Sequence, residues 1–303
     1  MPPRKRKRSS VYDDFTRGIR EGDITLVSDA LSGEVFLNDL RFEGGHTALM
    51  VCLRNGYEEI AKLLLKNGSD VHARCNKGFT ALHYAFQYPD IVKVLIEGGA
   101  EINAHDVNGV TALMLASEGG YGRTVELLLE KEANVHWYCW WKVQTALMYA
   151  AKHKGDDPTI IDMLVEKGGD RILNKKDHSG NNALMYAAYH GNTRIVESLI
   201  RHMKSAACID FSDENKAGMT ALALAAERGH EKIFHMLATP KEIVKKTKKG
   251  LTPLGMLLGS VKKKSIDYAK SVQTWLDEEK EKLPDQSYLK ICKINQNEFK
   301  RLS

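Results

Sequence analysis

The residues whose types most clearly indicate a function are five consecutive ones, Trp137-Tyr138-Cys139-Trp140-Trp141. They include three of the four tryptophans in the 303-residue chain. Their chemistry is recognition. Trp and Tyr bury a large area with few rotatable bonds, so they are enriched among the residues that dominate binding at protein interfaces. We predict a partner-binding edge formed by Trp137, Tyr138, Trp140 and Trp141. The alternative is that the rings stack on neighbouring segments and only stabilise the fold.

A second candidate is the basic run Lys5-Arg6-Lys7-Arg8, which fits a nuclear-import signal. Its cationic side chains would bind an acidic groove, which makes an import receptor a candidate partner. The alternative is a solvated tail. With Arg4, the run carries five positive charges, equal to the net charge of +5, so the rest of the chain is neutral. We expect the protein in the nucleus, the cytoplasm or both.

A third candidate is a group of lysines accompanied by one acid, Glu242. The lysines are Lys241, Lys245, Lys246, Lys248, Lys249, Lys262, Lys263 and Lys264. Such a cluster can meet an acidic protein, nucleic acid or a lipid headgroup. We favour a solvated face neutralised by the acids between 277 and 281. The second functional hypothesis is a nuclear protein that associates with nucleic acid or chromatin through these lysines and the basic tail. It ranks below protein binding because no RNA-binding aromatic motif or DNA-reading helix accompanies the lysines.

Motifs of catalysis and metal binding are missing from the sequence. It has no nucleophile elbow, phosphate loop, paired-carboxylate signature or zinc motif. His83 and His230 are expected to be structural, and the five dispersed cysteines to be reduced. We expect no enzyme activity, no cofactor and no metal. No apolar run approaches the ~18 to 20 residues that span a bilayer. No apolar segment typical of a signal peptide follows the basic N-terminus. We therefore expect neither membrane insertion nor secretion.

The elements that must position these residues are repeated ones. Thr-Ala-Leu begins at Thr47, Thr80, Thr111, Thr145 and Thr220, with variants at Asn182 and Thr252, and the successive steps are 33, 31, 34, 37, 38 and 32 residues. We call the first residue of each tripeptide its anchor. A period near 33 residues is typical of stacked helical repeats.

Each repeat has the same internal order. A Gly lies two residues before six of the seven anchors, where a turn with positive φ would need it; Val143 takes this place in the fourth repeat. A short alanine-rich helix follows the anchor, then a polar turn, then a second helix with apolar residues at i, i+3 and i+4, such as Ile60, Leu63 and Leu64. Insertions and deletions are expected in loops, with helix lengths preserved.

This pattern resembles the ankyrin repeat. Residues 106–116 read D-V-N-G-V-T-A-L-M-L-A, residues 192–200 read N-T-R-I-V-E-S-L-I, and residues 99–103 read G-A-E-I-N. Two features depart from the family pattern: the Pro after Thr is present only as Pro253, and the family His only as His83. The resemblance implies protein recognition by hairpin tips and first helices on a concave face, without catalysis.

The predicted fold is an all-α ankyrin-repeat solenoid. It would contain about seven helix-turn-helix units with short β-hairpin-like loops, preceded by a capping half-repeat that lacks an anchor. We predict a disordered basic tail over residues 1–11, the repeat array over 12–280, and a tail or capping extension over 281–303. The protein is expected to be a monomer and a non-enzymatic scaffold or adaptor for a partner protein, with nucleic acid not expected as the partner.

Overall fold

The computed structural model describes residues 8–33, 35–206, 211–239, 242–243 and 245–260, and these residues are mostly helical. They belong to two compact units, residues 1–141 and 142–303. The described elements of the first unit are α1 (Arg8–Glu21), α2 (Ile24–Leu31), η1 (Glu43–Gly45), α3 (Ala48–Asn55), α4 (Glu58–Lys66), α5 (Ala81–Tyr84), α6 (Pro89–Glu97), α7 (Ala112–Gly119), α8 (Gly122–Glu130) and β1 (Tyr138–Cys139).

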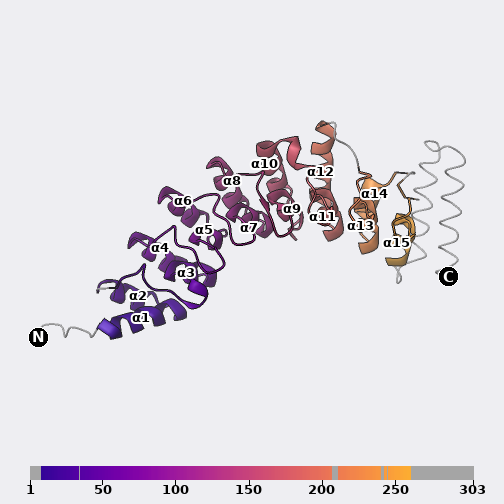
Figure 1. Ribbon diagram of the computed structural model, residues 1–303. Coiled ribbons are helices and arrows are strands. Elements are labelled where there is room, and N and C mark those ends of the chain that lie inside the picture. The colour runs from indigo at the N-terminus through magenta and orange to yellow at the C-terminus, as the bar shows by residue number, and fades with distance from the viewer. Residues whose placement is uncertain (1–7, 34, 207–210, 240–241, 244, 261–303) are drawn as a thin grey trace, which may run out of the picture. The chain divides into compact units, whose positions relative to one another are not determined.

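The second unit contains the same kind of helix pairs. Its described elements are β2 (Gln144–Thr145), α9 (Ala146–Ala151), α10 (Thr159–Gly168), η2 (Asp170–Ile172), α11 (Ala183–His190), α12 (Thr193–Ser205), α13 (Ala221–Arg228), α14 (Glu231–Leu237) and α15 (Pro253–Ser260). In Figure 1, the first helices of successive repeats follow one another along one side of each unit, and the second helices along the other.

The anchors explain where the first helices begin. The Thr47 hydroxyl accepts a hydrogen bond from the Met50 backbone N–H, and Thr111, Thr145 and Thr220 cap their helices in the same way. Asn182 does so through its side-chain oxygen, at 2.9 Å from the Met185 nitrogen. Such a cap satisfies a backbone donor that the helix leaves unpaired and contributes about 1 kcal/mol.

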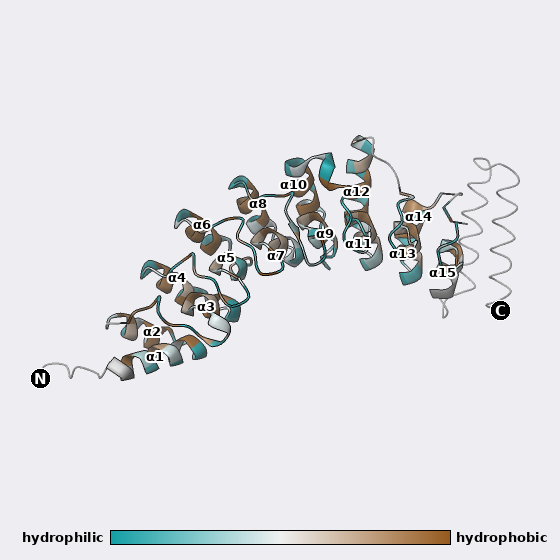
Figure 2. Cartoon of the chain, viewed as in Figure 1, coloured by the Kyte–Doolittle hydropathy of each residue, from teal (hydrophilic) through white to brown (hydrophobic). Residues whose placement is uncertain are grey.

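The apolar core of each unit lies between its first and second helices. The third residue of every anchor tripeptide is a leucine exposed by 3% or less: Leu49, Leu82, Leu113, Leu147, Leu184, Leu222 and Leu254. Ile60, Val125 and Ile195 of the second helices are equally buried. Figure 2 shows hydrophobic residues along the helices and hydrophilic ones at many turns and helix ends. Truncating one such leucine to Ala should cost about 2–5 kcal/mol.

The predicted turn glycines are confirmed, whereas the prediction of constant helix length is wrong. The six glycines two residues before an anchor have φ between 72° and 84°. However, α5 has four residues and α12 has thirteen. The 31-residue step shortens α5 because Pro89 already starts α6, and part of the insertion before the sixth repeat extends α12 through the buried Met203.

The first unit begins with a helix pair that has no Thr-Ala-Leu anchor. Helix α1 starts at Arg8, inside the segment 1–11 that was predicted as a basic tail, and buries Phe15 and Ile19 completely. Asp23 caps α2 by accepting from the backbone N–H groups of Thr25 and Leu26. The N-terminal cap therefore consists of two helices, each with buried apolar residues.

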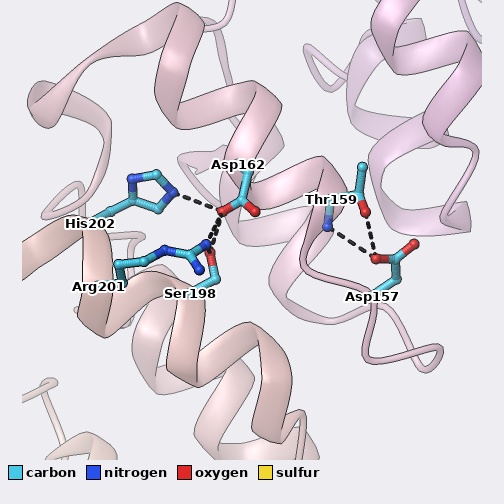
Figure 3. A network of polar contacts seen from close by, with 6 residues as sticks. All are labelled: Asp157, Thr159, Asp162, Ser198, Arg201 and His202. Atoms are coloured by element: carbon cyan, nitrogen blue, oxygen red, sulfur yellow. Dashed lines mark hydrogen bonds and ion pairs between the residues drawn. The ribbon is translucent and has the colours of Figure 1, made fainter.

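Two second helices of the second unit are joined by a carboxylate, as Figure 3 shows. Asp162 of α10 accepts from three side chains of α12: Ser198 at 2.5 Å, His202 at 2.8 Å and Arg201 at 2.9 Å. Burial acts to raise the pKa of Asp162, but these hydrogen bonds together hold it below its usual value. Asp162 thus connects two repeats through its charge.

Candidate protein-binding site

The four predicted binding residues lie together at the end of the first unit, in the hairpin tip after α8. We call Trp137, Tyr138, Trp140 and Trp141 the aromatic tip. The exposed fractions are 66% for Trp141, 52% for Tyr138 and 46% for Trp140, and Trp137 is half-buried. Cys139 between them is 1% exposed. The tip therefore combines an anchored side with a side that faces solvent.

The anchored side is held by the preceding hairpin tip. The Trp137 indole N–H donates to the Gly109 carbonyl at 3.1 Å, and the Trp140 indole N–H donates to the Val107 carbonyl at 2.9 Å. Both rings also contact His105, whose centroid is 5.1 Å from Trp137 in a stacked arrangement and 4.9 Å from Trp140 edge-on. Satisfied indole donors and ring contacts fix the orientation of these two tryptophans.

Gly109 makes this approach sterically feasible. Its φ is +84°, and a Cβ added there would lie 2.7 Å from Cε3 of Trp140. No real Cβ tolerates that distance from a ring carbon. The backbone of one tip is thus in direct contact with the ring of the next.

The exposed side is an apolar patch. Among the described residues, eight large hydrophobic side chains are exposed, and four of them belong to these two tips: Val107, Tyr138, Trp140 and Trp141. Isolated exposed apolar residues are ordinary, but a contiguous group of them marks a binding site. Within the aromatic segment, Trp137 packs against the preceding tip, whereas Trp141 is presented to solvent.

Val107 also belongs to this apolar patch, and the sequence holds a positional signal for it. Val107 and Trp141 are both four residues before their anchors, where the other described repeats have polar residues: Glu43, Asn76, His178, Lys216 and Lys248. The position one residue earlier varies among the repeats. It is Asp106 in the third, whose carboxylate accepts from the Asn108 and Val110 backbone N–H groups, and Trp140 in the fourth.

The fourth hairpin differs from the third at two turn positions. Trp140 stands where Asp106 caps the third turn, and Val143 replaces the Gly of the other six repeats while keeping a positive φ of 57°. A β-branched residue in this left-handed region is strained. Departures from local structural preference are found most often at functional sites.

The other predicted residues lie elsewhere or outside the described residues. Lys5, Arg6 and Lys7 precede the described range, and Arg8 is the first residue of α1. Of the lysine group, Lys241, Lys262, Lys263 and Lys264 are outside the described residues, as are the acids expected to neutralise it. Lys245 pairs with Glu214 at 2.9 Å, and the Lys248 ammonium donates to the Lys216 carbonyl.

The histidines singled out from the sequence have structural partners. His83 is 1% exposed; its Nδ1 is 2.9 Å from the Thr80 hydroxyl and its Nε2 is 3.0 Å from the Val110 carbonyl. Burial lowers the pKa of His83 to about 4. In the described part of the chain, no cluster of three or more His, Cys, Asp or Glu has the makings of a metal site. None of the helices described is both long enough and apolar enough to cross a membrane.

The repeated helix pairs define a helical-repeat protein. A family model described as "Ankyrin repeats (3 copies)" matches residues 18–106, 68–138, 88–175 and 147–250, well over half of the chain. The chain belongs to the ankyrin-repeat family, as its repeat pattern predicted. Ankyrin repeats generally mediate protein–protein interaction, and are typically not enzymatic.

Three relatives illustrate the similarity. Ankyrin repeat domain-containing protein 63 of Mus musculus is 35% identical over 118 residues, 39% of this chain and 29% of that protein. Ankyrin repeat-containing protein BDA1 of Arabidopsis thaliana is 33% identical over 103 residues, 34% of this chain and 20% of that protein. Protein phosphatase 1 regulatory subunit 27 of Mus musculus is 34% identical over 92 residues, 27% of this chain and 60% of that protein. The chain thus spans less than two thirds of each.

Proposed function

We propose that the protein is a non-enzymatic adaptor that binds a partner protein, with the aromatic tip as the main contact of the interface. The observation that carries this proposal is the exposure of Trp140 and Trp141 beside Val107, on a hairpin whose turn lacks the Gly of the other six repeats. Anchored aromatic rings lose little conformational entropy on binding, which favours their use as binding anchors.

A relative's name agrees with a role of this kind. One relative is named as a regulatory subunit of protein phosphatase 1. By analogy, this chain would act as the non-catalytic member of a complex with another protein. The analogy concerns the type of role only.

The test places a photo-crosslinking phenylalanine analogue at position 141 and, as a control, at position 36. Phe36 is 53% exposed, so the control probes a comparably exposed aromatic site away from the aromatic tip. We expect an adduct with a specific protein only from position 141. The purified partner is then titrated against Trp141→Ala and Phe36→Ala.

Trp141→Ala should weaken binding by roughly 2 kcal/mol or more, over tenfold in affinity, whereas Phe36→Ala should not. Thermal melting separates binding from packing: Trp141→Ala should leave stability nearly unchanged, and Trp137→Ala should lower it through loss of packing and of a hydrogen bond. Lost stability in Trp141→Ala together with unchanged binding would contradict the proposal and leave the tip as a packing element.

We also propose that Lys5, Arg6, Lys7 and Arg8 direct nuclear import, on the sequence grounds given above. A reporter fused to residues 1–10 should accumulate in the nucleus, and replacing the four residues with Ala should prevent this. If the full chain enters the nucleus equally well without the run, the import proposal fails while the adaptor proposal stands.

A further inference from the structure

The first helices of the second unit carry cations placed over tyrosine rings. The Lys152 ammonium lies 4.6 Å from the ring centroid of Tyr149 in α9 and 4.5 Å from that of Tyr186 in α11. The Arg228 guanidinium at the end of α13 lies 4.0 Å from the centroid of Tyr189 in α11. Two successive junctions between repeats are therefore bridged by a cation–π contact.

We call Tyr149, Lys152, Tyr186, Tyr189 and Arg228 the tyrosine–cation face. Hydrogen bonds to residues of the neighbouring loops hold its side chains in place. The Tyr186 hydroxyl donates to Asp177 at 2.5 Å, and the Lys152 ammonium donates to the Gln144 side-chain oxygen at 2.7 Å. The rings are half-buried, whereas Arg228 is exposed. The face is thus largely preorganised before any partner arrives.

The charge on this side of the unit is positive. Residues 146–155, 183–190 and 221–228 contain three Lys and Arg residues, which are Lys152, Lys154 and Arg228, and one acid, Glu227. Two acids of the neighbouring loops, Asp177 and Asp156, are hydrogen-bonded within the fold. Asp177 accepts from the backbone N–H groups of Ser179 and Asn181 as well as from Tyr186. Asp156 accepts from the backbone N–H groups of Arg194 and Ile195.

We propose that the tyrosine–cation face binds an acidic peptide segment of a partner protein, with the segment's carboxylates on Arg228 and Lys152 and its apolar atoms on the tyrosine rings. Charge complementarity of this kind sets partner choice and accelerates encounter. The proposal rests on the proposed function only in that it names a second surface for a protein partner, away from the aromatic tip.

A peptide fits this face better than single-stranded nucleic acid does. Nucleic acid would need ring faces on which bases can stack and a continuous row of phosphate contacts. Here a cation already covers one side of the Tyr149, Tyr186 and Tyr189 rings. The two cations of the face, Lys152 and Arg228, belong to the fourth and sixth repeats, and α11 between them contains no Lys or Arg, so they do not form a continuous row.

The pKa of His190 can report on the positive charge of this face. His190 is the last residue of α11. Partial burial of its ring lowers its pKa, and the charges of Lys152, His230 and Lys154 lower it further. The pKa of His230 is lowered in the same way, by burial and then by Arg228. A carboxylate bound near these groups should raise the pKa of His190, because a nearby opposite charge favours the protonated ring.

The experiment titrates the full chain at low salt with a synthetic peptide of alternating glutamate and glycine. We expect saturable binding that weakens as salt is added and a rise of the His190 pKa measured by NMR. Arg228→Gln should weaken binding about fivefold or more. Arg194→Gln, which removes an exposed charge on α12, should change it by less than about twofold. Circular dichroism of both variants excludes unfolding as the cause.

Three outcomes would overturn the proposal. They are no saturable binding of the acidic peptide, equal binding of a lysine–glycine peptide, and tighter binding of oligothymidylate that Arg228→Gln also weakens, which would assign the face to nucleic acid. Trp141→Ala is measured with the same peptide and should bind it like the unmodified protein. A failure here therefore leaves the aromatic tip untouched, and a failure of the aromatic tip leaves this face untouched.

Discussion

The indole N–H of Trp140 donates to the carbonyl oxygen of Val107 at 2.9 Å, so that a side chain of one hairpin tip is bonded to the backbone of the tip before it. Neighbouring tips elsewhere are also joined through their backbones, as where the Asn76 N–H donates to the Gly44 carbonyl. Trp140 thus adds an aromatic surface to a junction that the fold already makes. Half of its ring stabilises the stack and half remains available to a partner.

Replacing Gly109 with Ala should disrupt this junction. The added methyl would meet the Trp140 ring at 2.7 Å, and φ at this position is +84°. We expect a loss of about 2 kcal/mol or more in the free energy of unfolding, because strain and overpacking add. Urea unfolding followed by tryptophan fluorescence measures both the stability and the movement of the ring.

Gly68→Ala is the matched control. Gly68 has a φ of +80°, and a Cβ there would meet nothing within 4 Å. The free energy of unfolding of Gly68→Ala should therefore fall by only about 1 kcal/mol, the cost of a non-glycine residue in the left-handed region. Its tryptophan emission spectrum should be unchanged. Equal losses in the two variants would mean that Trp140 does not crowd Gly109.

Val143→Gly should stabilise the protein. Val143 has a φ of 57°, a region that costs a non-glycine residue about 1–2 kcal/mol. Glycine removes this strain but adds about 0.4–1 kcal/mol of entropy to the unfolded chain. The net gain should be on the order of 0.5–1 kcal/mol, measured as a rise in the urea midpoint with an unchanged slope. Val107→Gly, at a tip position without positive φ, should give no gain.

The sequence predicted the repeats well because each one has a local cause. A Thr that caps a helix, a Gly that accepts positive φ and a buried Leu stand at fixed spacing, and the structure uses each of them in this way. Helix ends were harder to predict. Met203 extends α12 because it reaches buried surface, and burial depends on neighbours that the local sequence does not reveal.

The candidate sites were only partly predictable for the same reason. The exposure of Trp141 followed from its place at a hairpin tip, but the contact of Trp140 with Val107 joins residues 33 apart in the sequence. The tyrosine–cation face was missed entirely. Tyr149 and Tyr186 share one helix position in adjacent repeats, so a comparison of repeat positions one by one would have found the pair. The placement of Lys152 between their rings depends on side-chain conformation.

His83 should make stability depend on pH. Burial lowers its folded-state pKa to about 4, against about 6.5 in the unfolded chain. Between these values the unfolded state binds more protons, so stability should fall as the pH drops from 7 to 4, by on the order of 3 kcal/mol from this group. His83→Met introduces the residue found at the equivalent positions Met50 and Met114. Unfolding measured across this range should show a smaller pH dependence in the variant, and an unchanged dependence would contradict the assignment.

The last prediction concerns Asp162, which joins α10 to α12 through Ser198, Arg201 and His202. Its pKa is held below the usual value in the folded state, so its contribution to stability is present above about pH 4 and is lost as the pH falls through the folded pKa. Asp162→Asn keeps the shape but removes the charge, and should cost about 1–2 kcal/mol at pH 7.

Asp157 provides the matched control for Asp162. It is also a carboxylate with a lowered pKa, held first by the Thr159 hydroxyl at 2.7 Å and then by the Thr159 backbone N–H, but these contacts stay within one turn. Asp157→Asn should therefore cost less at pH 7 than Asp162→Asn, because the hydrogen bonds of Asp157 to Thr159 stay within its own repeat. Chemical unfolding of both variants and the unmodified protein at pH 7 and pH 3 makes the comparison. The difference in unfolding free energy between Asp162→Asn and the unmodified protein should shrink at pH 3. This pH is below the unfolded-state pKa of about 3.9, so the unfolded chain gains a proton that the folded carboxylate resists. An equal difference in unfolding free energy at both pH values would show that the side-chain shape of Asp162, and not its charge, stabilises the contact between the two helices.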